Sequence, residues 1–248
     1  MPSCRVSRAR LGFVTRLAAA TKPLWRPAAM LSTGLCVATL IGFSSLSTGR
    51  WGLNGNVADA DETDDELDTI VATLELLVDA DADATRQCLR LLADKTQARE
   101  LDGGRRTRLA KSIGPLVDSL LKRPASDPLR ADAAILAASL RLSAGTVPTR
   151  AIATDAQAEF ESRRRALAAL IAAEDRASLE IADSWLGTAG PDLAVAALGL
   201  MGRLDQPRVA EMVLRRYPSL TDETRPKAIE LLTQRPSWSV KLLDAIAR

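Results

Sequence analysis

Apolar residues recur at helical spacing along most of this chain, from about Asp65 to its C-terminal end. In the first such stretch the apolar side chains fall three or four residues apart, which places them on one face of an α-helix. These residues are Leu67, Ile70, Val71, Leu74, Leu77 and Val78. No run with the alternation of a β-strand reaches comparable strength. The sequence therefore predicts an all-α fold.

The composition favours the same fold class. Apolar residues make up 47% of the 248 residues, whereas aromatic residues make up only 3%. Alanine and leucine supply most of the apolar side chains, and both lose little conformational freedom in a helix, while aromatic and β-branched residues suit strands better. A chain of this length and apolar content is able to bury a sizeable core.

Cap and turn signals divide the helical region into hairpins. Asp127-Pro128 predicts a helix start, because aspartate caps a helix and proline fits its first position. Gly145 and Pro148 predict the end of that helix. Further helix pairs start at intervals of 31 to 32 residues, near Glu159, Pro191 and Asp222. This spacing predicts an α-solenoid of about five helical hairpins over residues 66–248, each stable only against its neighbours.

The N-terminal 49 residues carry a targeting pattern. Residues 1–26 hold six basic side chains and no acid, and residues 27–49 are uncharged and largely apolar. This order is typical of a signal peptide or of an N-terminal membrane anchor, and the apolar run is about the 20 residues that a spanning helix needs. Ala58-Asp59-Ala60 offers a cleavage site, so both alternatives stay open. A buried helix or an organellar transit peptide fits less well.

The targeting pattern also gives an orientation. The basic flank is expected to stay in the cytoplasm, with the remainder of the chain beyond the membrane. The sequence therefore predicts an exported protein, either periplasmic or anchored to the cytoplasmic membrane.

Residues 50–65 are rich in acids, glycine and asparagine, which predicts a solvated linker. Asp59, Asp61, Thr63 and Asp65 alternate as in a calcium-binding loop. However, the sixth and twelfth positions counted from Asp59 are Asp64 and Ile70, where an EF-hand requires glycine and glutamate. A linker that leads into the acidic first turn of a helix explains the run better.

The residue types exclude most enzyme chemistry. The chain has no histidine, so it has no histidine base, Ser-His-Asp or Cys-His arrangement, or histidine zinc ligand. The one glycine doublet, Gly103-Gly104, lacks the Gly-Lys-Ser/Thr of a phosphate loop. Cys88 is the only cysteine outside the N-terminal segment, and we expect it in a buried helix face. We predict a non-enzymatic protein with no catalytic residue, cofactor or metal.

Two arginine clusters are the candidate interaction surface. Some helical-repeat proteins hold DNA backbones with such arginines, so nucleic-acid binding is one interpretation. The formal net charge of +2, the scarcity of aromatic residues and the export pattern argue against it. Consecutive arginines on an amphipathic helix usually form its solvated face, which can bind an acidic protein partner. The candidate residues are Arg105, Arg106 and Arg108 in one cluster and Arg163, Arg164 and Arg165 in the other.

Two segments carry a resemblance to a known family. They are SRRRALAAL at 162–170 and VLRRYPSLTDETRPKAIELLTQRPSWSVKLLDAI at 213–246. In order and spacing, their turns and core positions resemble the HEAT-repeat region of large exported planctomycete proteins described as membrane-bound dehydrogenases. In those proteins a β-propeller precedes the helical repeats and a c-type haem domain follows them. The resemblance covers about two thirds of the chain and implies a HEAT-like fold.

The resemblance implies a partner more than an activity. This chain contains neither a propeller segment nor a Cys-x-x-Cys-His motif, so haem attachment does not carry over. We expect a protein-interaction scaffold on the outer side of the cytoplasmic membrane, with a propeller or c-type haem protein as one possible partner. The alternatives are an accessory part or remnant of a membrane-bound dehydrogenase/c-type haem system and, third, a nucleic-acid binder. The oligomeric state stays open.

Overall fold

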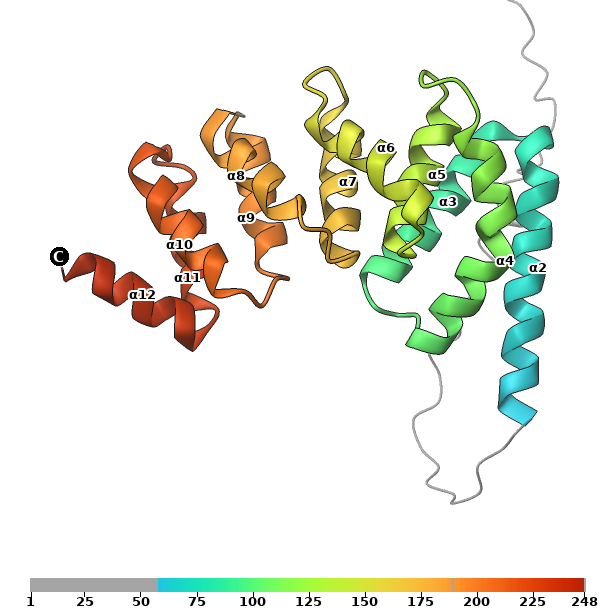
Figure 1. Ribbon diagram of the computed structural model, residues 1–248, viewed down its shortest axis with the longest axis horizontal. Coiled ribbons are helices and arrows are strands. Elements are labelled where there is room, and N and C mark those ends of the chain that lie inside the picture. The colour runs from blue at the N-terminus through green and yellow to red at the C-terminus, as the bar shows by residue number, and fades with distance from the viewer. Residues whose placement is uncertain (1–57, 189, 248) are drawn as a thin grey trace, which may run out of the picture. The chain divides into compact units, whose positions relative to one another are not determined.

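The computed structural model describes residues 58–188 and 190–247, and every regular element in these ranges is helical (Figure 1). They contain eleven α-helices, one short 3₁₀ helix and no strand, which confirms the predicted all-α fold. The elements are α2 (Ala58–Ala80), α3 (Ala82–Gln97), α4 (Gly103–Leu121), α5 (Pro128–Ser139), α6 (Ser143–Thr154), α7 (Phe160–Ala172), α8 (Ser178–Thr188), α9 (Pro191–Met201), α10 (Pro207–Arg216), η1 (Tyr217–Ser219), α11 (Arg225–Thr233) and α12 (Pro236–Ile246).

The helices contact one another in a regular order. The odd-numbered helices α3, α5, α7, α9 and α11 each pack on the next in that series. Of the even-numbered helices, α2 packs on α4, and α10 packs on both α8 and α12. Helices adjacent in sequence also pair, most extensively α5 with α6 and α6 with α7 (Figure 1). Each hairpin therefore contacts mainly the hairpins next to it in sequence.

Capping side chains explain where several helices begin. Asp81, Asp102 and Asp127 precede α3, α4 and α5, and each accepts a hydrogen bond from a backbone N–H of the first turn. Proline occupies the first turn of α5, as the Asp127-Pro128 pair predicts, and also the first turns of α9, α10, α11 and α12. Both features satisfy or remove backbone donors that lack a partner at a helix start.

Helix α5 lies at the centre of the contact network. Nine of its twelve residues are buried, and it packs on α3, α4, α6 and α7. Several of the buried residues are alanines with no exposed surface, including Ala133, Ala134 and Ala137. Because these side chains are short, neighbouring helices can approach the α5 backbone closely. This position also places the carboxylate of Asp132 among side chains from other helices.

Helix α6 corrects the sequence analysis. Gly145 and Pro148, which we expected to end the preceding helix, both lie inside α6. The helix forms in spite of its low intrinsic propensity because it packs closely on α5. The Thr149 hydroxyl, fully buried, donates a hydrogen bond of 2.8 Å to the carbonyl oxygen of Ala134. Tertiary packing here overrides local propensity.

The start of α2 also differs from expectation. It begins at Ala58, inside the segment predicted as a linker over 50–65, so residues 58–65 are helical. Acidic side chains are favourable near a helix N-terminus, and alanine is the best helix former. The rest of the linker and the N-terminal segment 1–49 lie outside the described residues. Among the helices of 58–188 and 190–247, none combines the length and apolar character needed to cross a membrane.

Candidate functional site

The structure gives the three consecutive arginines of α7 three different roles. The guanidinium carbon of Arg163 lies 5.3 Å from the centroid of the buried Trp185 ring, at cation–π distance. Arg164 is paired with Glu161 one turn earlier, with 2.9 Å between Nε and Oε2. Arg165 is only 6% exposed and is therefore not part of an exposed surface. Helical periodicity is the cause, because consecutive residues on a helix point about 100° apart.

Arg165 belongs to a buried ion cluster that joins three helices. Its Nη1 lies 3.1 Å from Oδ1 of Asp132 in α5, which is itself 5% exposed. The same carboxylate accepts hydrogen bonds from Nε of Arg86 at 3.2 Å and from Nε of Arg90 at 3.0 Å, both in α3. Arg165 also donates to the carbonyl oxygen of Arg90 at 3.2 Å. The arrangement satisfies a buried carboxylate, so its role is structural.

Arg105, Arg106 and Arg108 lie in the first turns of α4, beside the capping residue Asp102. Oδ1 of Asp102 accepts the backbone N–H of Arg105 at 2.8 Å, and this hydrogen bond is the main cause that lowers the pKa of the carboxyl group below its ordinary value of 3.8. The Arg105 side chain turns back toward the same carboxylate, with 3.6 Å between Nε and Oδ2. Arg106 is half-buried and lines a pocket.

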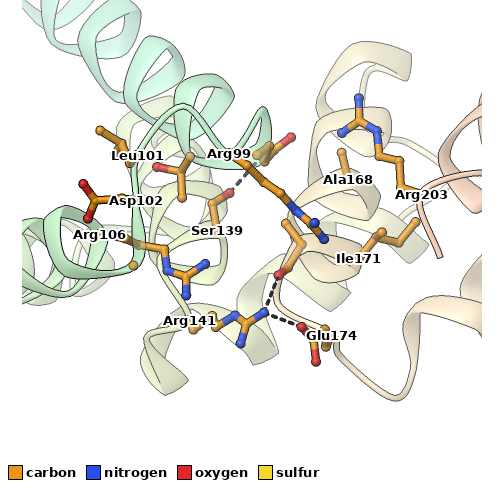
Figure 2. Close-up of a pocket in the computed structure, with 14 residues that line it drawn as sticks. Arg99, Leu101, Asp102, Arg106, Ser139, Arg141, Ala168, Ile171, Glu174 and Arg203 are labelled. Carbon is orange, nitrogen blue, oxygen red and sulfur yellow. Dashed lines mark hydrogen bonds and ion pairs between the residues drawn. The ribbon is translucent and has the colours of Figure 1, made fainter. Parts of the chain in front are cut away.

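This pocket, which we call the arginine pocket, is the candidate functional site. It has a volume of about 470 Å³ and is lined by residues of α3, α4, α5 and α7, by the turns that follow α3, α5 and α7, and by Arg203 after α9. Figure 2 shows four arginine side chains entering it from separate elements: Arg99, Arg106, Arg141 and Arg203. Only Arg106 belongs to the surface that the sequence predicted, and Arg105, Arg108 and the α7 cluster do not line this pocket.

The pocket lies where α3, α5 and α7 end. Each of these helices is followed by a residue in the left-handed conformation, with φ of 60° at Arg99, 64° at Arg141 and 57° at Glu174. In each case the next backbone N–H bonds to a carbonyl five residues back, as in a Schellman motif. Glycine is the usual residue at this position, and another residue costs roughly 1–2 kcal/mol there. The described residues contain no other non-glycine residue with positive φ.

Positive side chains outnumber negative ones in the lining of the arginine pocket. Nη2 of Arg141 lies 2.5 Å from Oε1 of Glu174 and 3.4 Å from the carbonyl oxygen of Ala172. Among the described residues, Arg99, Arg106 and Arg203 form no ion pair with a carboxylate. Four arginines face two carboxylates, those of Asp102 and Glu174, so the lining carries a formal charge of +2.

The lining of this site has the side-chain chemistry that anion binding requires. Guanidinium groups bind carboxylates and phosphates through paired hydrogen bonds and do not titrate in the physiological range. Within 58–188 and 190–247 no three histidine, cysteine or carboxylate side chains gather as a metal site would require. Cys88 is partly buried against the core of the helical region, and burial raises the pKa of its thiol above the ordinary value of 9.0. It is therefore a poor nucleophile.

Sequence reasoning missed three of the four arginines in the pocket. Arg99, Arg141 and Arg203 are isolated in the sequence, each just beyond the end of an odd-numbered helix. The predicted interaction surface consisted instead of arginines that are close together in the sequence. The available signal was a charged residue shortly after the end of several successive helices. That signal can be recognised only when the helix ends are known.

Comparison with known proteins adds no assignment to this geometry. No protein-family model, no curated protein and no solved structure matches the chain. The resemblance to the HEAT-repeat region of exported planctomycete proteins therefore stays a prediction.

Proposed function

We propose that this protein is a non-enzymatic protein-interaction scaffold on the outer side of the cytoplasmic membrane, and that it docks an acidic protein partner through the arginine pocket. One observation carries the proposal: a pocket of about 470 Å³ whose lining has a formal charge of +2 and holds three arginines that pair with no carboxylate of residues 58–188 and 190–247. Unpaired guanidinium groups in one depression favour a ligand that brings carboxylates.

The helical arrangement supports a HEAT-like α-solenoid as the scaffold. The odd-numbered helices pack on one another in chain order, and α7, α9 and α11 start at residues 160, 191 and 225. Ion pairs also connect residues one repeat apart, such as Asp132 with Arg165 and Asp183 with Arg216. Stacked repeats present equivalent helix ends along one edge, which suits them to binding extended partners.

The proposed location depends on the N-terminal segment. Residues 1–26 are basic and residues 27–49 are uncharged, a pattern that directs the following domain across the membrane. The helical domain would then meet envelope proteins, among them those of the propeller and haem classes that the resemblance implies. Nucleic acid is not an expected ligand there.

Arg203→Glu is expected to weaken partner binding about tenfold or more. The change removes the charge-assisted hydrogen bond between the Arg203 guanidinium and a carboxylate of the partner. It also places a second negative charge next to that carboxylate. Partners would be captured by cross-linking the tagged full-length chain in envelope fractions of the cells that produce it. The captured protein, once identified and purified, would then be titrated against both variants.

Arg208→Glu is the matched control. Arg208 is an exposed arginine of α10 outside the arginine pocket, so the same change in net charge should alter the affinity less than about twofold. Equal effects of the two variants would contradict docking in the pocket. Capture of nucleic acid in place of protein would contradict the scaffold itself.

A further inference from the structure

The left-handed residues of the arginine pocket call for an explanation beyond folding. Arg99, Arg141 and Glu174 occupy the position after a helix end where glycine fits without strain. Selection for stability alone would favour glycine at all three. Instead, each carries a charged side chain into the same pocket (Figure 2). Such strain tends to be kept where the side chain has a function.

The helix dipole does not account for all three charges. A cation near a helix C-terminus is favourable, which fits Arg99 after α3 and Arg141 after α5. Glu174 occupies the same position after α7 and has the opposite sign. Its carboxylate instead holds Arg141, at 2.5 Å from Nη2. One arginine of the pocket is thus already engaged by a glutamate, which leaves Arg99, Arg106 and Arg203 for a ligand.

The lining of the pocket also indicates which chemical groups the ligand carries. A formal charge of +2 is neutralised by two carboxylates. The buried Ala168 and Ile171 and the half-buried Leu101 also line the pocket, and they can contact the methylene groups of a glutamate. The Arg141–Glu174 pair shows that a glutamate side chain fits beside an arginine here.

We propose that the arginine pocket is a recognition site for two adjacent glutamates in an extended acidic segment of a protein partner, with Arg99, Arg106 and Arg203 as the binding residues. This inference rests on the proposed scaffold function and names the chemistry that its partner must present. Arg141 is held by Glu174 and is not one of the binding residues.

The test uses the full-length protein and a short peptide with Glu-Glu between serine and glycine residues. The same peptide with Gln-Gln and inorganic pyrophosphate serve as comparison ligands. Wild-type protein should bind the Glu-Glu peptide, with the affinity falling as salt is added, and should bind the Gln-Gln peptide at least about tenfold more weakly. Binding of pyrophosphate alone would overturn the assignment to glutamates.

Two substitutions to glycine separate binding from stability. Arg99→Gly and Glu174→Gly both relieve a left-handed residue, so both should leave the melting temperature unchanged or raise it. Arg99→Gly should weaken peptide binding about tenfold, whereas Glu174→Gly should not weaken it. If Arg99 has only a structural role, Arg99→Gly will leave the affinity unchanged, and that result overturns the inference.

Different results would refute the scaffold function and the glutamate site. Capture of a protein partner that is unaffected by Arg99→Gly would leave the scaffold function in place and refute the glutamate site. Peptide binding that depends on Arg99, without any protein partner in envelope fractions, would keep the site and refute the scaffold.

Discussion

Asp132→Ala is expected to lower the free energy of unfolding by about 3–5 kcal/mol, the largest effect of any single substitution considered for this protein. Asp132 is 5% exposed and its carboxylate pairs with Arg86, Arg90 and Arg165. Arg86 and Arg90 keep about a third of their side-chain surface in water and can turn outward. Arg165 cannot, because it is 6% exposed and lies between α3 and α5. Its charge would remain buried without Asp132.

Urea unfolding followed by circular dichroism would measure this loss. Asp94→Ala is the control, because Asp94 also lies near Arg165, at 3.5 Å, but is 58% exposed. That change should cost less than about 1 kcal/mol. Replacing Arg165 by methionine in the Asp132→Ala background should recover part of the stability, since it removes the unpaired charge. A cost below about 1 kcal/mol for Asp132→Ala would refute the structural role of the cluster.

Gly145→Ala is expected to destabilise the protein by about 3 kcal/mol, although alanine is the better helix former. A Cβ at Gly145 would lie 2.5 Å from Cβ of Ala137, 2.6 Å from the backbone nitrogen of Ala138 and 2.8 Å from the carbonyl oxygen of Ala134. Two of these three atoms belong to the α5 backbone, so no side-chain rotation relieves the overlap. Helices α5 and α6 must move apart, which disturbs the most extensive contact in the structure.

Gly199→Ala provides the matched comparison for this prediction. Gly199 lies within α9, and a Cβ there would have no neighbouring atom within 4 Å. The same substitution should therefore raise the stability by as much as about 1 kcal/mol. Thermal unfolding of both variants tests the prediction. If both substitutions raise the melting temperature, α5 and α6 are not in close contact.

Asp132 and Gly145 also show what could and could not be predicted from the sequence. Apolar periodicity and caps found most of the helices, including those that carry Leu74, Leu136 and Leu167. Helix α6 was missed because a glycine and a proline usually end helices, and its stability comes from contact with α5. The ion cluster around Asp132 was missed for a similar reason, since its members come from helices that are distant in sequence.

The candidate site was predictable only in part. Runs of arginine are visible in a sequence, and Arg106 from one of them does line the pocket. Arg165, from the other run, is buried because helical geometry turns it away from its neighbours and toward Asp132. The pocket itself combines single residues as far apart as Arg99 and Arg203, and only the packing of successive hairpins brings them together.

Hydrogen-exchange mass spectrometry of the full-length protein, with and without the Glu-Glu peptide, tests docking in the arginine pocket most directly. The account predicts slower exchange in the segments that line the pocket, and unchanged exchange in α10 to α12. Those segments are residues 96–106, 139–141, 168–174 and Arg203. Slower exchange confined to α10 to α12, or no change anywhere at a peptide concentration that saturates binding, would contradict it.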